Sequence, residues 1–173
     1  MYLISAYFDD VTTEKLQKYI DDVATASGNT FMIDNSVPPH MTILSIEARN
    51  ELVLMNSFKE QVDKLSKGEI LIPTIGQLLP YVMYAGVVMN SYLDDMQRNM
   101  MNAMKDIDEV SFSKFYQPDS WSPHITLGKT LTPTQMTEAF NILHQRFSPI
   151  QGTIVELGLA KTNPHRDILR FEL

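Results

Sequence analysis

The chain has 173 residues, of which 44% are hydrophobic and 20% are charged, a composition that predicts a folded domain with one core and argues against disorder. Its net charge of -7 argues against a large electrostatic contact with duplex DNA but is compatible with a small or single-stranded phosphate ligand in a local positive pocket. The absence of cysteine excludes disulfides, thiolate catalysis and cysteine-ligated zinc.

The sequence also lacks the features of a membrane or exported protein. No segment has the run of roughly 18–20 apolar residues that a membrane-spanning helix needs. Residues 1–8 lack the basic start and the length of a signal peptide. We therefore expect a cytoplasmic protein that has no membrane partner.

Strand and helix patterns alternate in the first half of the chain. Gly28 suits the end of the first helix, and Asn50 suits the N-cap of the second. On the second helix we expect an apolar face formed by Leu52, Met55, Val62 and Leu65. The elements predicted in this half are strands at 2–8, 30–33, 40–47 and 69–75, a helix at 13–26 and a helix after Asn50.

The second half repeats this order of elements. Asn90 is expected to cap a helix whose methionines recur every three or four residues, which predicts a face packed on the core. Thr132 followed by Pro133 predicts the start of another helix, with Phe140 on its buried side. The remaining elements predicted here are strands at 81–89, 121–127, 152–160 and 167–172, an irregular stretch at 109–120 and a turn at Asn163-Pro164.

The repeated order predicts an internal duplication with approximate twofold symmetry. Each half reads as strand, helix, strand, helix, strand, and no linker or low-complexity segment separates the two. We therefore expect a single domain, 1–173, built from lobes at approximately 1–79 and 80–173 that share a central cleft. A complete cleft within one chain predicts a monomer.

A short motif recurs in the two halves and is the strongest functional signal. Pro39-His40-Met41-Thr42 is matched 84 residues later by Pro123-His124-Ile125-Thr126. On a strand, side chains two residues apart project from the same face, so each histidine is expected beside a threonine hydroxyl. The residues between and after them, such as Met41 and Ile125, then point into the core. Two imidazoles and two hydroxyls are thus predicted to converge on one cleft.

This set of side chains suits the cleavage of a phosphodiester. Histidine titrates near neutrality, so a pair provides one base to activate a water or hydroxyl and one acid to protonate the departing oxygen. Thr42 and Thr126 would hold the non-bridging phosphate oxygens, and Lys129 is the candidate cation. As a lone lysine it is also consistent with a solvated charge at the end of a strand. The sequence leaves open which histidine is the acid.

The other histidines and the motif spacing argue against a metal site. His144, on the last predicted helix, and His165, beside the terminal turn, are expected on the surface. Neither motif places a second histidine or a carboxylate at the spacing of zinc ligands, and catalytic zinc usually has three protein ligands. We expect no metal and no cofactor.

Three aromatic residues lie just before the second motif. Phe115 and Tyr116 are candidates to stack on a nucleobase, although packing is the commoner role for such residues. Trp121 lies three positions before His124, an odd step along a strand, so it is expected on the opposite face and in the core.

The paired motifs Pro-His-Met-Thr-Ile-Leu and Pro-His-Ile-Thr-Leu-Gly-Lys resemble the signature of the 2H phosphoesterase superfamily, which includes the bacterial 2′-5′ RNA ligase-like proteins. The strand at 81–89 and the segment from Gly152 to Leu173 also resemble segments of that family. The resemblance implies a bilobal α+β fold, in which two antiparallel sheets flank a central cleft and the helices pack outside. Members often have arginine where Lys129 stands; lysine keeps the charge but loses the planar bidentate fork.

The resemblance further implies an activity. The chain is similar to enzymes that open 2′,3′-cyclic phosphates of nucleotides or RNA ends, or that hydrolyse or ligate 2′-5′ linkages, without metal or ATP. His40 and His124 would form the acid–base pair and Thr42 and Thr126 the phosphate ligands. The substrate would be a small cyclic-phosphate nucleotide, a short RNA or a 2′-5′ oligonucleotide. A nucleotide-binding or scaffolding module that uses the same cleft without chemistry is the alternative.

Overall fold

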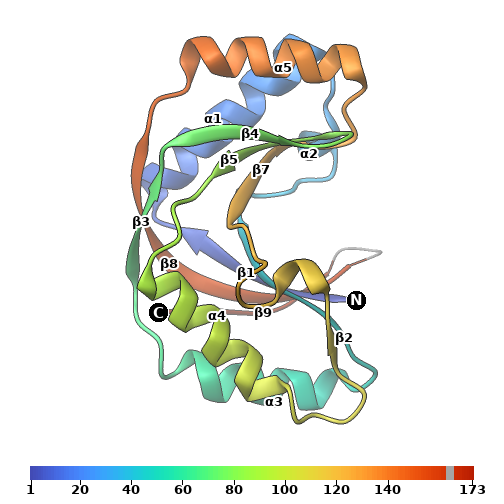
Figure 1. The fold of residues 1–173 in the computed structure, drawn as a ribbon, viewed down its shortest axis with the longest axis vertical. Coiled ribbons are helices and arrows are strands. Elements are labelled where there is room, and N and C mark those ends of the chain that lie inside the picture. The colour runs from blue at the N-terminus through green and yellow to red at the C-terminus, as the bar shows by residue number, and fades with distance from the viewer. Residues whose placement is uncertain (163–165) are drawn as a thin grey trace.

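The computed structural model describes residues 1–162 and 166–173, and within them nine strands form one curled antiparallel sheet (Figure 1). The strands are β1 (Tyr2–Phe8), β2 (Met41–Glu47), β3 (Gly68–Ile72), β4 (Thr74–Leu78), β5 (Val82–Gly86), β6 (Ser111–Phe112), β7 (His124–Gly128), β8 (Ile150–Lys161) and β9 (Arg166–Glu172). The helices are α1 (Asp10–Ser27), α2 (Phe31–Asp34), α3 (Glu51–Val62), α4 (Ser91–Met104) and α5 (Pro133–Arg146), with a 3₁₀ turn, η1, at Lys114–Tyr116.

Two groups of strands meet at a narrow joint in this sheet. The strand order is β3-β8-β1-β2-β7-β5-β4, with β9 beside β8 and β6 beside β2. In the described residues, β2 and β7 pair only where Met41 lies opposite Ile125. The predicted α+β class with antiparallel strands is confirmed. The two sheets expected from the sequence are joined by this one pair into a single sheet.

Helices cover the two ends of the molecule. α1 and α5 pack together against β7 and β5, whereas α3 and α4 pack together against β8 and β2. Figure 1 shows these two helix pairs at opposite ends, with the curled sheet between them. The segments 1–79 and 80–173 are interleaved in this arrangement, because α1 lies on β7 and β8 lies between β3 and β1. The division into two lobes stays a prediction.

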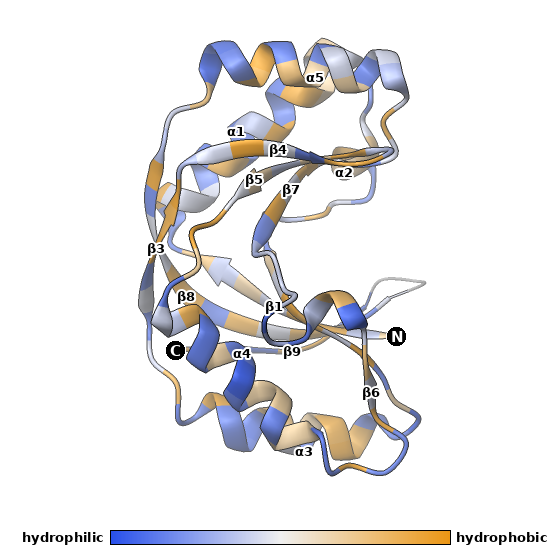
Figure 2. Cartoon of the chain, viewed as in Figure 1, coloured by the Kyte–Doolittle hydropathy of each residue, from blue (hydrophilic) through white to orange (hydrophobic). Residues whose placement is uncertain are grey.

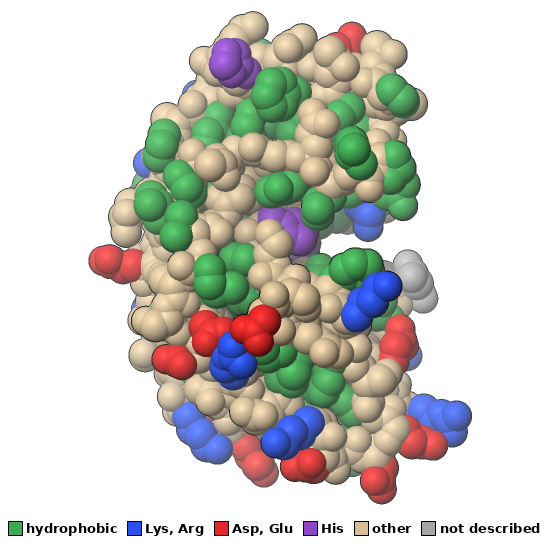
Figure 3. Space-filling model, viewed as in Figure 1, with side chains coloured by type: hydrophobic (Ala, Val, Ile, Leu, Met, Phe, Trp, Pro, Cys, Tyr) green, Lys and Arg blue, Asp and Glu red, His purple; other side chains and the backbone are tan. Residues whose placement is uncertain are grey.

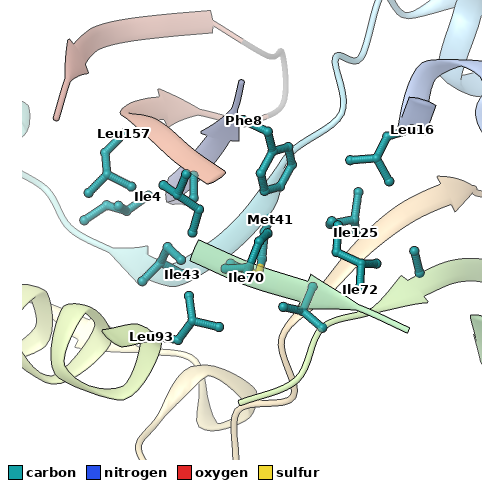
Figure 4. Packing of buried hydrophobic residues seen from close by; sticks show 14 of the residues in the cluster. Ile4, Phe8, Leu16, Met41, Ile43, Ile70, Ile72, Leu93, Ile125 and Leu157 are labelled. Atoms are coloured by element: carbon teal, nitrogen blue, oxygen red, sulfur yellow. The ribbon is translucent and has the colours of Figure 1, made fainter. Parts of the chain in front are cut away.

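The core lies between the sheet and the helices. Figure 4 shows Ile4, Met41, Ile43 and Leu93 converging from β1, β2 and α4. All four of these side chains are fully buried, and burying each such side chain stabilises the fold by about 1.5–3 kcal/mol. Orange and blue segments alternate along α5 in Figure 2, as expected for a helix with one apolar face. No helix in the described ranges combines the length and apolar character that crossing a bilayer requires.

The predicted helix ends are confirmed at several positions. The Asn90 side chain accepts a hydrogen bond from the Leu93 backbone N–H, and Gly28 ends α1 with a φ of 69°. Thr132 and Gln135 form a reciprocal capping box with Pro133 at the first helical position. These caps depend on contacts within one helical turn, which explains why the sequence predicts them.

Several sequence-based predictions were wrong. The segment 30–33 is helical rather than extended, since Asn29 Oδ1 accepts a hydrogen bond from the Phe31 N–H and begins α2. The strand predicted at 69–75 is two strands, β3 and β4, divided at Pro73, which has no N–H to donate to a ladder. Phe140 is exposed on α5. The predicted turn at Asn163-Pro164 lies outside the described residues.

The face predicted for the second helix was right in part, because Val62 is buried and Met55 and Leu65 pack partly buried against the core, whereas Leu52 does not. Leu52 is 64% exposed, and the buried residues of α3 are Leu54, Phe58 and Val62. The helix begins with four consecutive apolar residues, Leu52 to Met55, so periodicity alone does not select the side that packs.

Asp9 joins α1 to β8 through its carboxylate. Its Oδ1 accepts from the Thr12 N–H, and its Oδ2 accepts from the Thr12 hydroxyl and the Thr153 N–H. Burial raises the pKa of Asp9, but the hydrogen bonds from Thr12 and Thr153 outweigh burial and lower it below its usual value. The ionised carboxylate therefore stabilises the folded state.

We predict that Asp9→Asn lowers the free energy of unfolding by about 1–2 kcal/mol at neutral pH, because a charged acceptor is lost. The folded pKa is lowered, so this contribution is complete above the unfolded pKa of about 3.9 and disappears as pH falls through the folded value. Urea unfolding at pH 7 and under acidic conditions measures it. Asp10→Asn, at the exposed neighbouring position, should cost less than about 1 kcal/mol. A difference between wild type and Asp9→Asn that persists in strong acid would contradict the prediction.

Candidate active site

The two motifs lie on, or immediately before, the two strands that meet at the joint. Met41 and Ile43 on β2, and Ile125 and Leu127 on β7, are fully buried. His40, Thr42, His124 and Thr126 alternate with them and remain partly exposed. The alternation predicted from the sequence is confirmed, so the imidazole and hydroxyl of each motif share the open face of the sheet.

The register of the joint brings the two motifs together. Met41 lies opposite Ile125 in an antiparallel pair, and these are the middle residues of the two His-x-Thr segments. The histidine and the threonine of each motif lie on either side of this one pair, so all four side chains are grouped around the point where the two strands meet. This grouping suits a ligand held over the joint.

Both imidazoles are oriented by the same backbone contact. His40 Nδ1 lies 2.9 Å from the Pro38 carbonyl oxygen, and His124 Nδ1 lies 2.8 Å from the Ser122 carbonyl oxygen. A carbonyl oxygen only accepts, so Nδ1 donates in both rings. The neutral form of each ring then has its lone pair on Nε2, and the protonated form donates from Nε2. Both rings are thus prepared to take or give a proton at the same atom.

One cavity brings most of the predicted residues together. It has a volume of about 360 Å³, and its lining includes His40, Thr42, Tyr116, His124, Thr126 and Lys129. Figure 3 shows histidine surface, in purple, where the molecule is hollowed between its two ends. Phe115 is not part of the lining: its side chain is 67% exposed, with the Lys114 ammonium 5.1 Å from its ring centroid. The structure therefore does not bring Phe115 to the site.

Residues of the 109–120 stretch and α4 brace the first motif strand. The buried Gln97 amide donates hydrogen bonds to the backbone oxygens of Ile43 and Tyr116. Trp121 is buried, as predicted, and its indole N–H donates to the Thr42 backbone oxygen. Burial raises the pKa of the Tyr116 phenol, and a hydrogen bond with the Thr42 side chain opposes that shift. Tyr116 therefore supports a candidate phosphate ligand.

A tyrosine from the neighbouring strand packs against each histidine. The Tyr84 and His124 rings meet edge to face at 5.4 Å between centroids, and the Tyr7 and His40 rings lie 6.3 Å apart. Each tyrosine ring occupies the space above a glycine. A Cβ on Gly76 would lie 2.5 Å from Tyr84 Cζ, and a Cβ on Gly158 would lie 2.8 Å from Tyr7 Cε2. Because these glycines have no side chain, they leave room for the tyrosine rings to pack against the histidines.

Charged residues surround the Tyr7 ring. The Arg170 guanidinium stacks 3.7 Å from the Tyr7 ring centroid and also pairs with Glu156. Burial raises the pKa of Tyr7 to about 12; Arg170 opposes the shift, and Asp167 and Glu156 add to it. Tyr7 therefore stays a neutral phenol at physiological pH.

The remaining predicted residues are placed as follows. Lys129 is exposed at the end of β7 and reaches the cavity, where its ammonium lies 5.8 Å from the Phe31 ring centroid. His144 is exposed on α5, as predicted, and His165 lies outside the described residues. Across the described ranges, no group of three or more His, Asp or Glu side chains is positioned to hold a metal ion.

Sequence reasoning missed several residues of the site. Phe31 lines the cavity, Tyr7 and Tyr84 contact the histidines, and Ser45 forms part of the wall. Both tyrosines lie on the first predicted strand of their half of the repeat, but only the structure pairs those strands with the motif strands. Phe31 had no signal, because the segment before the first motif was expected to be extended.

The sequence matches the family model of the 2′-5′ RNA ligase superfamily over residues 13–166. The chain belongs to this superfamily. The match includes both motif strands and extends from α1 to the start of β9. The resemblance stated from the sequence is thereby confirmed. Among curated proteins, none matches this sequence significantly.

Three solved structures have folds similar to that of this chain over almost its whole length. A crystal structure described as a phosphoesterase has a TM-score of 0.67 at 14% identity, covering 99% of this chain and 97% of its own. The protein TT0787 of Thermus thermophilus has a TM-score of 0.65 at 15% identity, with coverage of 99% and 97%. Escherichia coli LigT complexed with 3′-AMP has a TM-score of 0.63 at 12% identity, with coverage of 99% and 97%. At these identities the likeness shows the shared fold.

Proposed function

We propose that this protein is a metal-independent phosphodiesterase that uses His40 and His124 as its acid–base pair. It would open the 2′,3′-cyclic phosphates of nucleotides or RNA ends, or hydrolyse or ligate 2′-5′ phosphodiester linkages. The observation that carries the proposal is the single cavity lined by both histidines, both threonines and Lys129. Superfamily membership supports this class of chemistry.

The proposed reaction begins with one neutral and one protonated imidazole. The neutral ring takes a proton at Nε2 from a water whose oxygen attacks phosphorus. The protonated ring gives its proton to the ribose oxygen as the phosphorus–oxygen bond breaks, and each transfer typically contributes about 10²–10⁴ to the rate. The rings finish with exchanged protonation states, which proton exchange with solvent resets. Ligation would be the same step with the 5′-hydroxyl of a second ribose in place of water. That oxygen attacks the cyclic phosphate, the 3′-oxygen leaves with the proton from the protonated ring, and a 2′-5′ linkage remains.

The phosphate remains negatively charged throughout this reaction. The Thr42 and Thr126 hydroxyls would donate hydrogen bonds to the non-bridging oxygens, and Lys129 would supply positive charge at the rim of the cavity. Such groups are effective because they are already oriented toward the charge before the reaction begins.

The size of the cavity favours a small substrate. Its volume of about 360 Å³ lies in the usual range for small-ligand sites, roughly 300–1,000 Å³. LigT has been solved with 3′-AMP and also with NADP⁺, which supports a nucleotide as the ligand here. We propose a nucleotide or the end of a short RNA as substrate, no cofactor, and a monomer acting in the cytoplasm.

The test is a turnover assay on the purified chain with adenosine and uridine 2′,3′-cyclic phosphates and a 2′-5′ dinucleotide, with and without excess EDTA. We predict turnover of at least one substrate at a rate that EDTA does not change, because both proton transfers use imidazoles. Chromatography of the products distinguishes cyclic-phosphate opening from 2′-5′ cleavage.

Two results would contradict the proposal in different ways. Loss of turnover in EDTA, restored by adding a divalent metal, would indicate a metal-dependent mechanism. Binding of the nucleotides without turnover would select the alternative of a non-catalytic nucleotide-binding module.

A further inference from the structure

A second cavity adjoins the first on the His40 side. It has a volume of about 390 Å³, and Tyr7, Asn35 and Thr162 form part of its wall. It shares five lining residues with the first cavity, Leu3, Phe31, Val37, His40 and Lys129. The two hollows are therefore neighbouring parts of one groove, and His40, Phe31 and Lys129 stand where they meet.

Phe31 is the partly exposed aromatic residue at this junction. Its ring lines both hollows, with the Lys129 ammonium 5.8 Å from the ring centroid. A phenyl ring beside a cation and next to a proposed phosphate site provides what a nucleotide needs, a flat apolar face for the base and positive charge near the phosphate.

The Asn29 side chain connects the segment that carries Phe31 to the segment that carries Lys129. Asn29 Oδ1 accepts a hydrogen bond from the Phe31 N–H, and Asn29 Nδ2 donates to the backbone oxygen of Thr130, the residue after Lys129. The buried side chain of Met32 anchors α2 to the core. The position of Phe31 relative to Lys129 is thus set by the fold, which a recognition surface requires.

The aromatic residues expected from the sequence are less suited to stacking. Phe115 lies outside both hollows, and Tyr116 lines the first hollow but not the second. Tyr7 is almost fully buried, whereas Phe31 is partly exposed. Among these aromatic residues, Phe31 is therefore the best placed to stack on a base.

We propose that the second hollow is a nucleobase subsite, in which the base of the substrate stacks on Phe31 while Lys129 lies between the stacked base and the phosphate. This inference rests on the proposed function and deepens it. The subsite would favour a nucleoside phosphodiester as substrate over the cyclic phosphate of an alcohol without a base. Stacking tolerates every base, so the subsite selects for the presence of a base more than for its identity.

The test compares Phe31→Leu with wild type on adenosine 2′,3′-cyclic phosphate and on glycerol 1,2-cyclic phosphate, which has no base. We expect KM for the adenosine substrate to rise about 10- to 100-fold with little change in kcat, the usual effect of losing one stacked base. The kcat/KM for the glycerol substrate should stay the same. Phe31→Tyr, which keeps a ring, should restore the wild-type KM, and Phe140→Leu, on the exposed side of α5, should match wild type on both substrates.

The outcomes separate this inference from the proposed function. An equal loss on both substrates would show that Phe31 acts through the shape of the site, and no change on either would show that no base stacks on it. Both results overturn the subsite. If wild type turns over neither substrate, calorimetry with adenosine 3′-monophosphate and glycerol 2-phosphate replaces the kinetics. Weaker binding of the adenosine compound alone by Phe31→Leu would support the subsite even then, and an unchanged affinity would overturn it.

Discussion

Replacing either His40 or His124 with alanine is expected to lower kcat for a nucleoside 2′,3′-cyclic phosphate by about 10²–10⁴ with little change in KM. Each imidazole would move a proton only as bonds to phosphorus form or break, so its loss affects the transition state more than binding. The two rings share the same Nδ1 contact with a backbone carbonyl, so losses of similar size are expected from both. Steady-state kinetics at neutral pH measure them.

The double variant and a matched control sharpen this prediction. Removing both histidines should cost far less than the product of the two single losses, because one imidazole without the other already fails to complete the proton exchange. His144→Ala removes an exposed imidazole from α5 and should leave kcat unchanged. Activity that survives both motif substitutions would place the chemistry elsewhere, and equal losses from His144→Ala would indicate a general effect on folding.

The geometry of each motif strand could be predicted because it depends on short-range features. Side chains alternate on a strand whatever it pairs with, and the proline before each histidine favours an extended chain. The burial of Ile43 and Leu127 beside partly exposed Thr42 and Thr126 follows from that alternation. The pattern does not indicate the partner of each strand. The pairing of Met41 with Ile125, which joins the motifs, is therefore a result of the structure.

The aromatic wall of the site could not be predicted for a related reason. Phe115 and Tyr116 were candidates because they are close in sequence to His124, whereas Phe31 is 98 residues from Lys129 and reaches it through the hydrogen bond between Asn29 and Thr130. A four-residue segment such as 31–34 is too short for its periodicity to distinguish helix from strand. Its helical form, which brings Phe31 to the groove, depends on the hydrogen bond from the Phe31 N–H to Asn29 Oδ1, one residue before the N-cap, together with this long-range contact.

The Met41–Ile125 pair connects the stability of the fold to the proposed chemistry. Both side chains are fully buried, and Figure 4 shows them within the packed core. The histidines and threonines of the motifs flank this pair on the open face of the sheet. Because the described pairing of β2 with β7 is limited to these two residues, packing around them has a large share in setting the distance between the imidazoles.

We predict that Ile125→Ala lowers the free energy of unfolding by about 2–5 kcal/mol, the usual cost of truncating a buried isoleucine. We also expect kcat to fall by as much as about 10²-fold, since a shift near 1 Å in reacting groups is enough for such a loss. Urea unfolding gives the first value, and kinetics well below the unfolding transition give the second. Ile154→Ala deletes the same atoms from an equally buried position on β8, a strand that takes no part in the joint. It should show a comparable loss of stability with an unchanged kcat. If Ile125→Ala also leaves kcat unchanged while losing stability, the joint between β2 and β7 contributes to folding alone, and the spacing of the histidines must be set by their carbonyl and tyrosine contacts.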